Sequence, residues 1–376
     1  MDRKLMLVQR TRECFGDRLE DVRHMVREDR QAMRGWEEPA HVRAAARRAV
    51  REGGTSEEQA AVAVVEVEFS RPAAEPDRGQ QREAVGQVLE AGANALDKIA
   101  REPSPDLRPE EVLGLECVLL LYGRPAVLID QGRMGQAPPF WNVLEDQREE
   151  VELAARGVGR IELFGHPEYD WAGTGALVGE TTLLTSRRVA ETFAERRQDR
   201  WQFRPGITAW MDYRSPYQQV ASAGYRIRSV IGVHDVYDLA VLEVEPPQGN
   251  GKGPMPLALS AQEPPRLEGR PAYLIGYPVR DARRNEPERV ARIFRDVYNV
   301  KRVQPGQLRG LLRFENVQLL RHDCAPLGQT TGSPVLDLET HQVVGLQLGG
   351  RYLQESTAIP TWVLRDDPLL RRAGVT

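Results

Sequence analysis

The sequence predicts a mainly β protein with an α-helical N-terminal domain. In the first hundred residues, apolar side chains such as Phe15, Leu19, Val22 and Val26 recur at helical spacing between charged residues. Beyond residue 110, short β-rich runs separated by Gly, Pro and Asp take over. Many short strands at such spacing are typical of a barrel or a sandwich.

In the N-terminal region, a helical face over 15–26 comes first. A second helix is expected between Pro39 and Gly53. The next element, Gln59–Phe69, follows a capping-box pattern and is either helix or strand. Val85 to Ile99 again marks one helical face. The prolines at 103, 105 and 109 then interrupt the chain and predict a domain boundary.

In the β region, the stretch 246–256 is rich in Pro and Gly and is expected to be a flexible linker. The expected strands cover 125–130, 158–164, 174–185, 226–233, 238–244, 271–277, 333–338 and 342–349. We therefore predict a helical domain over 1–105, a connecting arm over 106–150, a first β-domain over 151–250 and a second over 251–376.

Composition excludes several classes of function. The net charge is −4 for 376 residues, and no nucleic-acid-binding motif is recognisable. The three cysteines have neither metal-ligand spacing nor an even number for disulfides, which fits a reducing cytoplasm and predicts neither metal nor cofactor. No apolar stretch has the length of a signal peptide or a membrane span, so we expect no membrane partner.

Three local motifs follow one another in the β region. The first is Gly-Thr-Gly-Ala-Leu-Val-Gly over 173–179, followed by Leu-Leu-Thr-Ser-Arg-Arg-Val over 183–189. The second is Asp-Leu-Ala-Val-Leu over 238–242. The third is Leu-Gly-Gln-Thr-Thr-Gly-Ser-Pro-Val over 327–335, followed by Val-Val-Gly-Leu-Gln-Leu-Gly-Gly over 343–350.

In this order, the motifs resemble those of the trypsin-like (chymotrypsin-fold) serine peptidases, particularly bacterial intracellular members and glutamyl endopeptidases. The resemblance covers about residues 150 to 365. It implies two six-stranded β-barrels and a histidine–aspartate–serine triad, in which the histidine takes the proton from the serine and the aspartate orients the histidine. Backbone N–H groups before the serine hold the oxyanion in such enzymes.

Transferred position by position, the triad falls on Arg188, Asp238 and Thr331. Only the aspartate is kept. Arginine stays protonated and offers no acceptor, so it cannot act as the base. A threonine hydroxyl is a weak nucleophile unless a base removes its proton. Loss of such groups costs on the order of a million-fold in turnover, so we expect ordinary peptide hydrolysis to be absent.

The surroundings of the triad also depart from the family pattern. The oxyanion donors would be the N–H groups of Gln329 and Thr331, in a loop that also holds Thr330, and Gln329 replaces a glycine of the family. Near the specificity pocket, the family's Ser-Thr pair has become Ala325-Pro326. Gln347 stands where glutamyl endopeptidases use a histidine to bind an acidic residue.

Three histidines and one cysteine are further candidates for chemistry. His166 and His234 are more simply surface or structural residues than a replacement base, and His322 matches a histidine that active relatives also carry. Cys324 matches a common family cysteine and is expected to be an inert core thiol. An Arg188–Asp238 ion pair would hold the two barrels together without chemistry.

We therefore predict a catalytically inactive trypsin-like module that binds a protein partner, in a bacterial signalling or defence system, and that another protease cleaves in the 246–256 linker. The N-terminal helices either pack on the barrels or serve as a docking surface. The alternative is an endopeptidase with a non-standard triad, in which Thr331 or Thr330 is the nucleophile. The sequence leaves the partner and the oligomeric state open.

Overall fold

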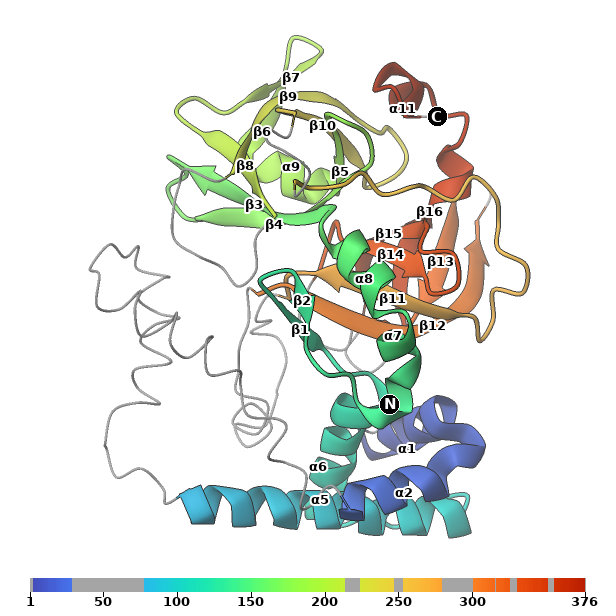
Figure 1. The fold of residues 1–376 in the computed structure, drawn as a ribbon. Coiled ribbons are helices and arrows are strands. Elements are labelled where there is room, and N and C mark those ends of the chain that lie inside the picture. The colour runs from blue at the N-terminus through green and yellow to red at the C-terminus, as the bar shows by residue number, and fades with distance from the viewer. Residues whose placement is uncertain are drawn as a thin grey trace. The chain divides into compact units, whose positions relative to one another are not determined.

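The computed structural model describes residues 3–28, 78–213, 224–246, 253–278, 300–314, 316–324, 330–350 and 355–375. Contacts divide the chain into two compact units. One unit holds the helices up to Gly123, and the other holds all the described strands (Figure 1). The helix expected after Pro39 and the element expected over Gln59–Phe69 lie outside the described residues.

The helical unit begins with two helices where the sequence predicts one continuous face. They are separated at Gly16, which has φ +51°, a left-handed conformation that favours glycine. Val22 and Val26 of the second helix are buried, as the helical spacing predicts. The described helices of this unit are α1 (Arg3–Phe15), α2 (Leu19–Glu28), α5 (Arg78–Arg101) and α6 (Pro109–Val118), with a π-helical turn over Leu119–Gly123.

This unit continues beyond the three prolines at which the sequence predicts a boundary. Pro109 is the first residue of α6, where proline is favoured because its missing N–H would have no partner within the helix. Helices α5 and α6 pack closely, since a Cβ at Gly92 would lie 2.6 Å from the carbonyl oxygen of Gly114. The boundaries of the four predicted segments stay a prediction.

The first barrel is closed by six antiparallel strands in the order β10-β5-β4-β3-β8-β9. Its interior is filled by aliphatic side chains, among them Ile161, Leu183, Met211 and Leu242, which are all fully buried. The strands are β3 (Val158–Phe164), β4 (Trp171–Leu177), β5 (Thr182–Thr185), β8 (Thr208–Asp212), β9 (Tyr225–Val233) and β10 (Ala240–Val244). A helix, α9 (Arg187–Phe193), and a hairpin of β6 (Ala194–Arg197) with β7 (Arg200–Phe203) lie between β5 and β8 in the chain.

The second barrel also has six antiparallel strands, which close because β11 pairs with both β14 and β12. They are β11 (Pro271–Gly276), β12 (Arg302–Arg313), β13 (Gln318–His322), β14 (Pro334–Asp337), β15 (Val343–Gly350) and β16 (Ser356–Pro360). The predicted arm adds β1 (Val127–Asp130) and β2 (Arg133–Met134) to this sheet beside β12, and then forms α7 (Asn142–Asp146) and α8 (Arg148–Ala155).

The two barrels and the helical N-terminal region confirm the predicted fold class. All eight expected runs contain strands, although 174–185 holds two, β4 and β5, with a turn between them. The 246–256 linker lies only partly within the described residues. After β16, the chain returns to the first barrel through α11 (Pro368–Arg372), which packs against β9.

Candidate functional site

Arg188 stands at the start of a short helix that follows directly on β5. Ser186 ends the strand segment and caps α9, since its Oγ accepts a hydrogen bond from the N–H of Val189 at 3.2 Å. Arg188 is therefore held by regular backbone, and its own N–H donates to Asp238 Oδ1 at 3.1 Å. Its side chain is 77% exposed. Its guanidinium thus extends into solvent from a fixed backbone position.

Asp238 lies at the end of the tight connection between β9 and β10. In this connection, His234 Nδ1 accepts the N–H groups of Val236 and Tyr237, both at 3.0 Å. The neighbouring Arg187 donates to the carbonyl oxygens of His234 and Tyr237. These contacts fix the backbone that leads into Asp238, whose side chain is 19% exposed.

Arg188 and Asp238 form an ion pair, with Nε 3.2 Å from Oδ2. Oδ2 has no hydrogen-bond partner in the described chain, so this is a contact of charges without hydrogen-bond alignment. Exposed pairs of this kind contribute about 0–1 kcal/mol. Both residues belong to the first barrel. The expectation that this pair holds the two barrels together is therefore wrong.

Thr331 lies in a tight turn that precedes β14. The N–H of Ser333 donates to the carbonyl oxygen of Thr330 at 3.1 Å, and the N–H of Gly332 donates to that of Gln347 at 2.9 Å. The Thr331 hydroxyl donates to the carbonyl oxygen of Leu348 on β15 at 3.4 Å. No nitrogen base contacts that hydroxyl among the described residues.

The turn touches the first barrel at the residues that lead into α9. A Cβ at Gly332 would lie 2.5 Å from the carbonyl oxygen of Thr174 and 3.2 Å from the backbone nitrogen of Ser186. Gly332 also has φ +85°, so glycine is required here for both space and conformation. The positions of Thr331, Arg188 and Asp238 thus lie around the junction of the two barrels.

His322 is close to this turn in the fold, but both of its ring nitrogens have other partners. It is fully buried, and its Nε2 is 2.5 Å from Gln347 Oε1. Its Nδ1 accepts the N–H of Cys324 at 3.3 Å. This leaves Nε2–H to donate to the amide oxygen. Burial lowers the pKa of His322 to about 4, so the ring is neutral at pH 7 with both nitrogens engaged.

The other histidines considered from the sequence also have structural partners. His234 Nε2 lies 3.0 Å from Asp367 Oδ2, and Asp367 is the residue that caps α11. This contact joins the β9–β10 connection to the C-terminal helix. His166 Nδ1 accepts two backbone N–H groups of its own exposed turn, those of Glu168 and Tyr169. Neither histidine contacts Thr331.

The residues expected to form the pocket and the oxyanion loop are described only in part. Ala325, Pro326 and Gln329 lie outside the described residues. Thr330 is buried, and its hydroxyl has no hydrogen-bond partner among the residues that the structure describes. Gln347 is 2% exposed, with its amide oxygen bound to His322. Cys324 is a buried free thiol.

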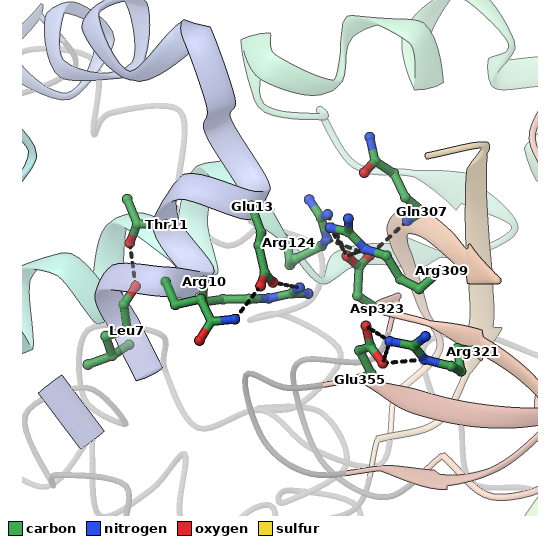
Figure 2. Close-up of polar contacts among 11 residues, drawn as sticks. Leu7, Arg10, Thr11, Glu13, Arg124, Gln307, Arg309, Arg321, Asp323 and Glu355 are labelled. Carbon is green, nitrogen blue, oxygen red and sulfur yellow. Dashed lines mark hydrogen bonds and ion pairs between the residues drawn. The ribbon is translucent and has the colours of Figure 1, made fainter. Parts of the chain in front are cut away.

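One cluster beside the site has no counterpart among the sequence predictions. Asp323 is fully buried in its side chain and accepts hydrogen bonds at 2.8 Å from Arg124 Nε and Nη2, from Arg309 Nε and from the N–H of Gln307 (Figure 2). Arg124 and Asp323 are 199 positions apart in the chain, so no local pattern could have paired them. This buried cluster fixes the backbone at the end of β13.

Within the described ranges, no three or more His, Cys, Asp or Glu side chains come together as a metal site. No helix in the described part of the chain is long and apolar enough to cross a membrane.

Residues 173–346 match the family model described as a trypsin-like peptidase domain. No curated protein sequence matches the chain. Among solved structures, the active form of the Rv3671c protease from M. tuberculosis is 16% identical with a TM-score of 0.41, covering 62% of this chain and 87% of that chain. The serine endoprotease from Yersinia pestis is 16% identical with a TM-score of 0.40, covering 63% of this chain and 69% of that chain.

Proposed function

Because the chain carries a trypsin-like peptidase domain, we propose that it binds a peptide segment of a partner protein at the barrel junction without cleaving it by the serine mechanism. The observation that carries this proposal is the Arg188 guanidinium, whose Nε lies 3.2 Å from Asp238 Oδ2 and which stands at the position that the sequence motifs assign to the base. A guanidinium remains protonated and has no lone pair to accept a proton. Asp238 is therefore paired with a permanent cation.

The surroundings of Thr331 support the same proposal. Its hydroxyl donates to a backbone carbonyl, which cannot remove the proton to generate an alkoxide. His322, which is buried nearby, is neutral and bound to Gln347. A peptide that binds beside Thr331 would therefore remain intact. Holding a segment without cutting it suits a scaffolding or inhibitory role, in a bacterial signalling or defence system.

A cytoplasmic location belongs to the same proposal. The three cysteines are free and buried, as is usual in a reducing compartment. Cleavage by another protease within 246–256 would release or change the bound partner. Incubation with host proteases followed by intact-mass measurement tests this step, and cleavage elsewhere in the chain would contradict it.

The second candidate is an endopeptidase with a non-standard triad. The family match favours this candidate over the non-catalytic module, because the matching family is described as a peptidase. In this case a group other than Arg188 would have to remove the proton from Thr331 or Thr330. A partner protein that supplies such a group would make turnover depend on the complex.

A fluorophosphonate probe distinguishes the two candidates, because it forms a covalent adduct only with an activated hydroxyl. We expect no adduct on the full chain by intact mass, with or without host lysate, and no cleavage of a randomised peptide library. An active trypsin-like protease in the same reaction controls for the probe. An adduct that appears on the wild type and is lost in Thr331→Ala would establish the endopeptidase.

A further inference from the structure

The guanidinium of Arg188 is bound on one edge only. Its Nε faces Asp238, and its backbone N–H is bound to the same carboxylate. Within the described part of the chain, its two terminal nitrogens have no acceptor. The adjacent Arg187 differs, because its terminal nitrogen donates to two backbone carbonyls. Arg188 therefore has a fixed backbone position and an exposed guanidinium edge with several N–H donors.

A second donor lies on the other side of the barrel junction. In the turn before β14, the N–H groups of Gly332 and Ser333 are both bound to carbonyl oxygens. The N–H of Thr331 has no acceptor among the described residues. This turn contacts Ser186, two residues before Arg188, since a Cβ at Gly332 would lie 3.2 Å from the Ser186 nitrogen. Backbone of the two barrels thus meets here, next to Thr331 on one side and two residues before Arg188 on the other.

The chemistry of these donors selects an anion with two oxygens. A guanidinium edge binds a carboxylate through two parallel N–H bonds, and charged hydrogen bonds are stronger than those to a neutral amide. The ion pair with Asp238 keeps Nε beside that carboxylate and leaves the terminal nitrogens of the guanidinium exposed to a ligand. A neutral peptide carbonyl offers one acceptor and no charge.

We propose that Arg188 and Thr331 form a carboxylate-binding site that recognises the C-terminal carboxylate, or an acidic side chain, of a bound peptide. This proposal rests on the proposed function and adds the class of ligand to it. A site of this kind distinguishes a free chain end from an internal peptide bond. If the ligand is a free end inside a longer protein, another protease must generate it.

Peptide binding measured by fluorescence anisotropy tests the site. The probes are labelled eight-residue peptides of randomised sequence, made as free acids and as C-terminal amides, each with and without Asp or Glu. We expect the carboxylate-bearing peptides to bind roughly tenfold or more tightly than amides that lack Asp and Glu, because a charged hydrogen bond is lost in the latter. Salt should weaken this preference.

Arg188→Met should abolish the preference for carboxylates, and Arg188→Lys should keep only part of it. The matched control is Arg228→Met, because Arg228 is also an exposed arginine of the first barrel with its Nε 3.8 Å from a carboxylate, that of Glu245. This control should keep the full preference. Far-ultraviolet circular dichroism and thermal melts should show that the variants remain folded.

The outcomes of this experiment distinguish failure of the carboxylate site from failure of peptide binding itself. Equal binding of the free acids and of amides that lack Asp and Glu would overturn the carboxylate site while leaving peptide binding in place. Binding of none of the peptides would overturn the proposed function itself. If Arg228→Met lost the preference for carboxylates as Arg188→Met does, the preference would come from the overall charge of the barrel. That result would overturn the proposed site.

Discussion

Replacing Asp323 by asparagine should cost the barrel unit a large part of its stability. The carboxylate is fully buried, and Arg124 beside it has a side chain that is 3% exposed. The second arginine, Arg309, has a side chain that is 14% exposed. An amide at position 323 keeps the shape but removes the negative charge, so two largely buried guanidinium groups would lose the carboxylate that they share.

The expected magnitude follows from this burial. Breaking a buried pair by removing one partner costs about 3–5 kcal/mol, because an uncompensated charge stays in a medium of low polarity. Small domains have a total free energy of unfolding of about 5–15 kcal/mol. Urea denaturation followed by tryptophan fluorescence measures the loss directly.

The same substitution on a neighbouring pair of strands provides the control. Arg321 and Glu355 form a pair of similar two-bonded geometry, with both hydrogen bonds at 2.6 Å, but their side chains are 34% and 35% exposed (Figure 2). Glu355→Gln should cost only about 0–1 kcal/mol, because solvent screens the charges. If Asp323→Asn and Glu355→Gln proved equally costly, burial would not be the cause and the reasoning would fail.

Three further predictions concern the barrel junction and two buried titratable side chains. Gly332→Ala should destabilise the protein by at least about 1 kcal/mol more than Gly310→Ala in the same denaturation assay. Both glycines have φ +85°, but only at Gly332 would a Cβ clash, because it would lie 2.5 Å from the carbonyl oxygen of Thr174. Burial lowers the pKa of Lys301 to about 7 from 10.5, so between these pH values the unfolded chain binds one more proton than the folded chain. The free energy of unfolding should therefore rise with pH across this window, by up to about 1.4 kcal/mol per pH unit. Lys301→Met should flatten this dependence of stability on pH. The pKa of His322, lowered to about 4 from 6.5, should make stability fall as pH drops from 6.5 to 4, and a His322→Gln variant that kept the full fall would refute this assignment.

Not every strand could be predicted from the sequence: β8 and β13 were missed although they contain neither glycine nor proline. The long strand β12 was missed because Pro305, Gly306 and Gly310 lie within it, and proline in a run argues against a strand. The β6–β7 hairpin turns on Gln198 and Asp199, with φ 46° and 62°, instead of on the Asn-Gly pair that usually marks such a turn.

Only part of the candidate site could be predicted from the sequence. The adjacency of Arg188 and Asp238 could be predicted because each lies in a short motif, and the motifs have a known order in the family that they resemble. Two features escaped prediction, because they depend on how distant segments pack. They are the exposure of the Arg188 side chain and the pairing of Arg124 with Asp323.

The return of the chain to the first barrel has a consequence for protein synthesis. Leu184 and Val241 of that barrel share one apolar cluster with Leu346 of the second barrel and with Leu370 and Val375. The Thr182 hydroxyl also donates to the carbonyl oxygen of Ala373 at 2.8 Å. A nascent first barrel therefore emerges from the ribosome with part of its apolar surface uncovered, and about 130 further residues must be made after β10 before Val375 is in place. During that interval the surface is open to chaperones, so the amount of protein that folds should depend on the rate of translation as well as on final stability.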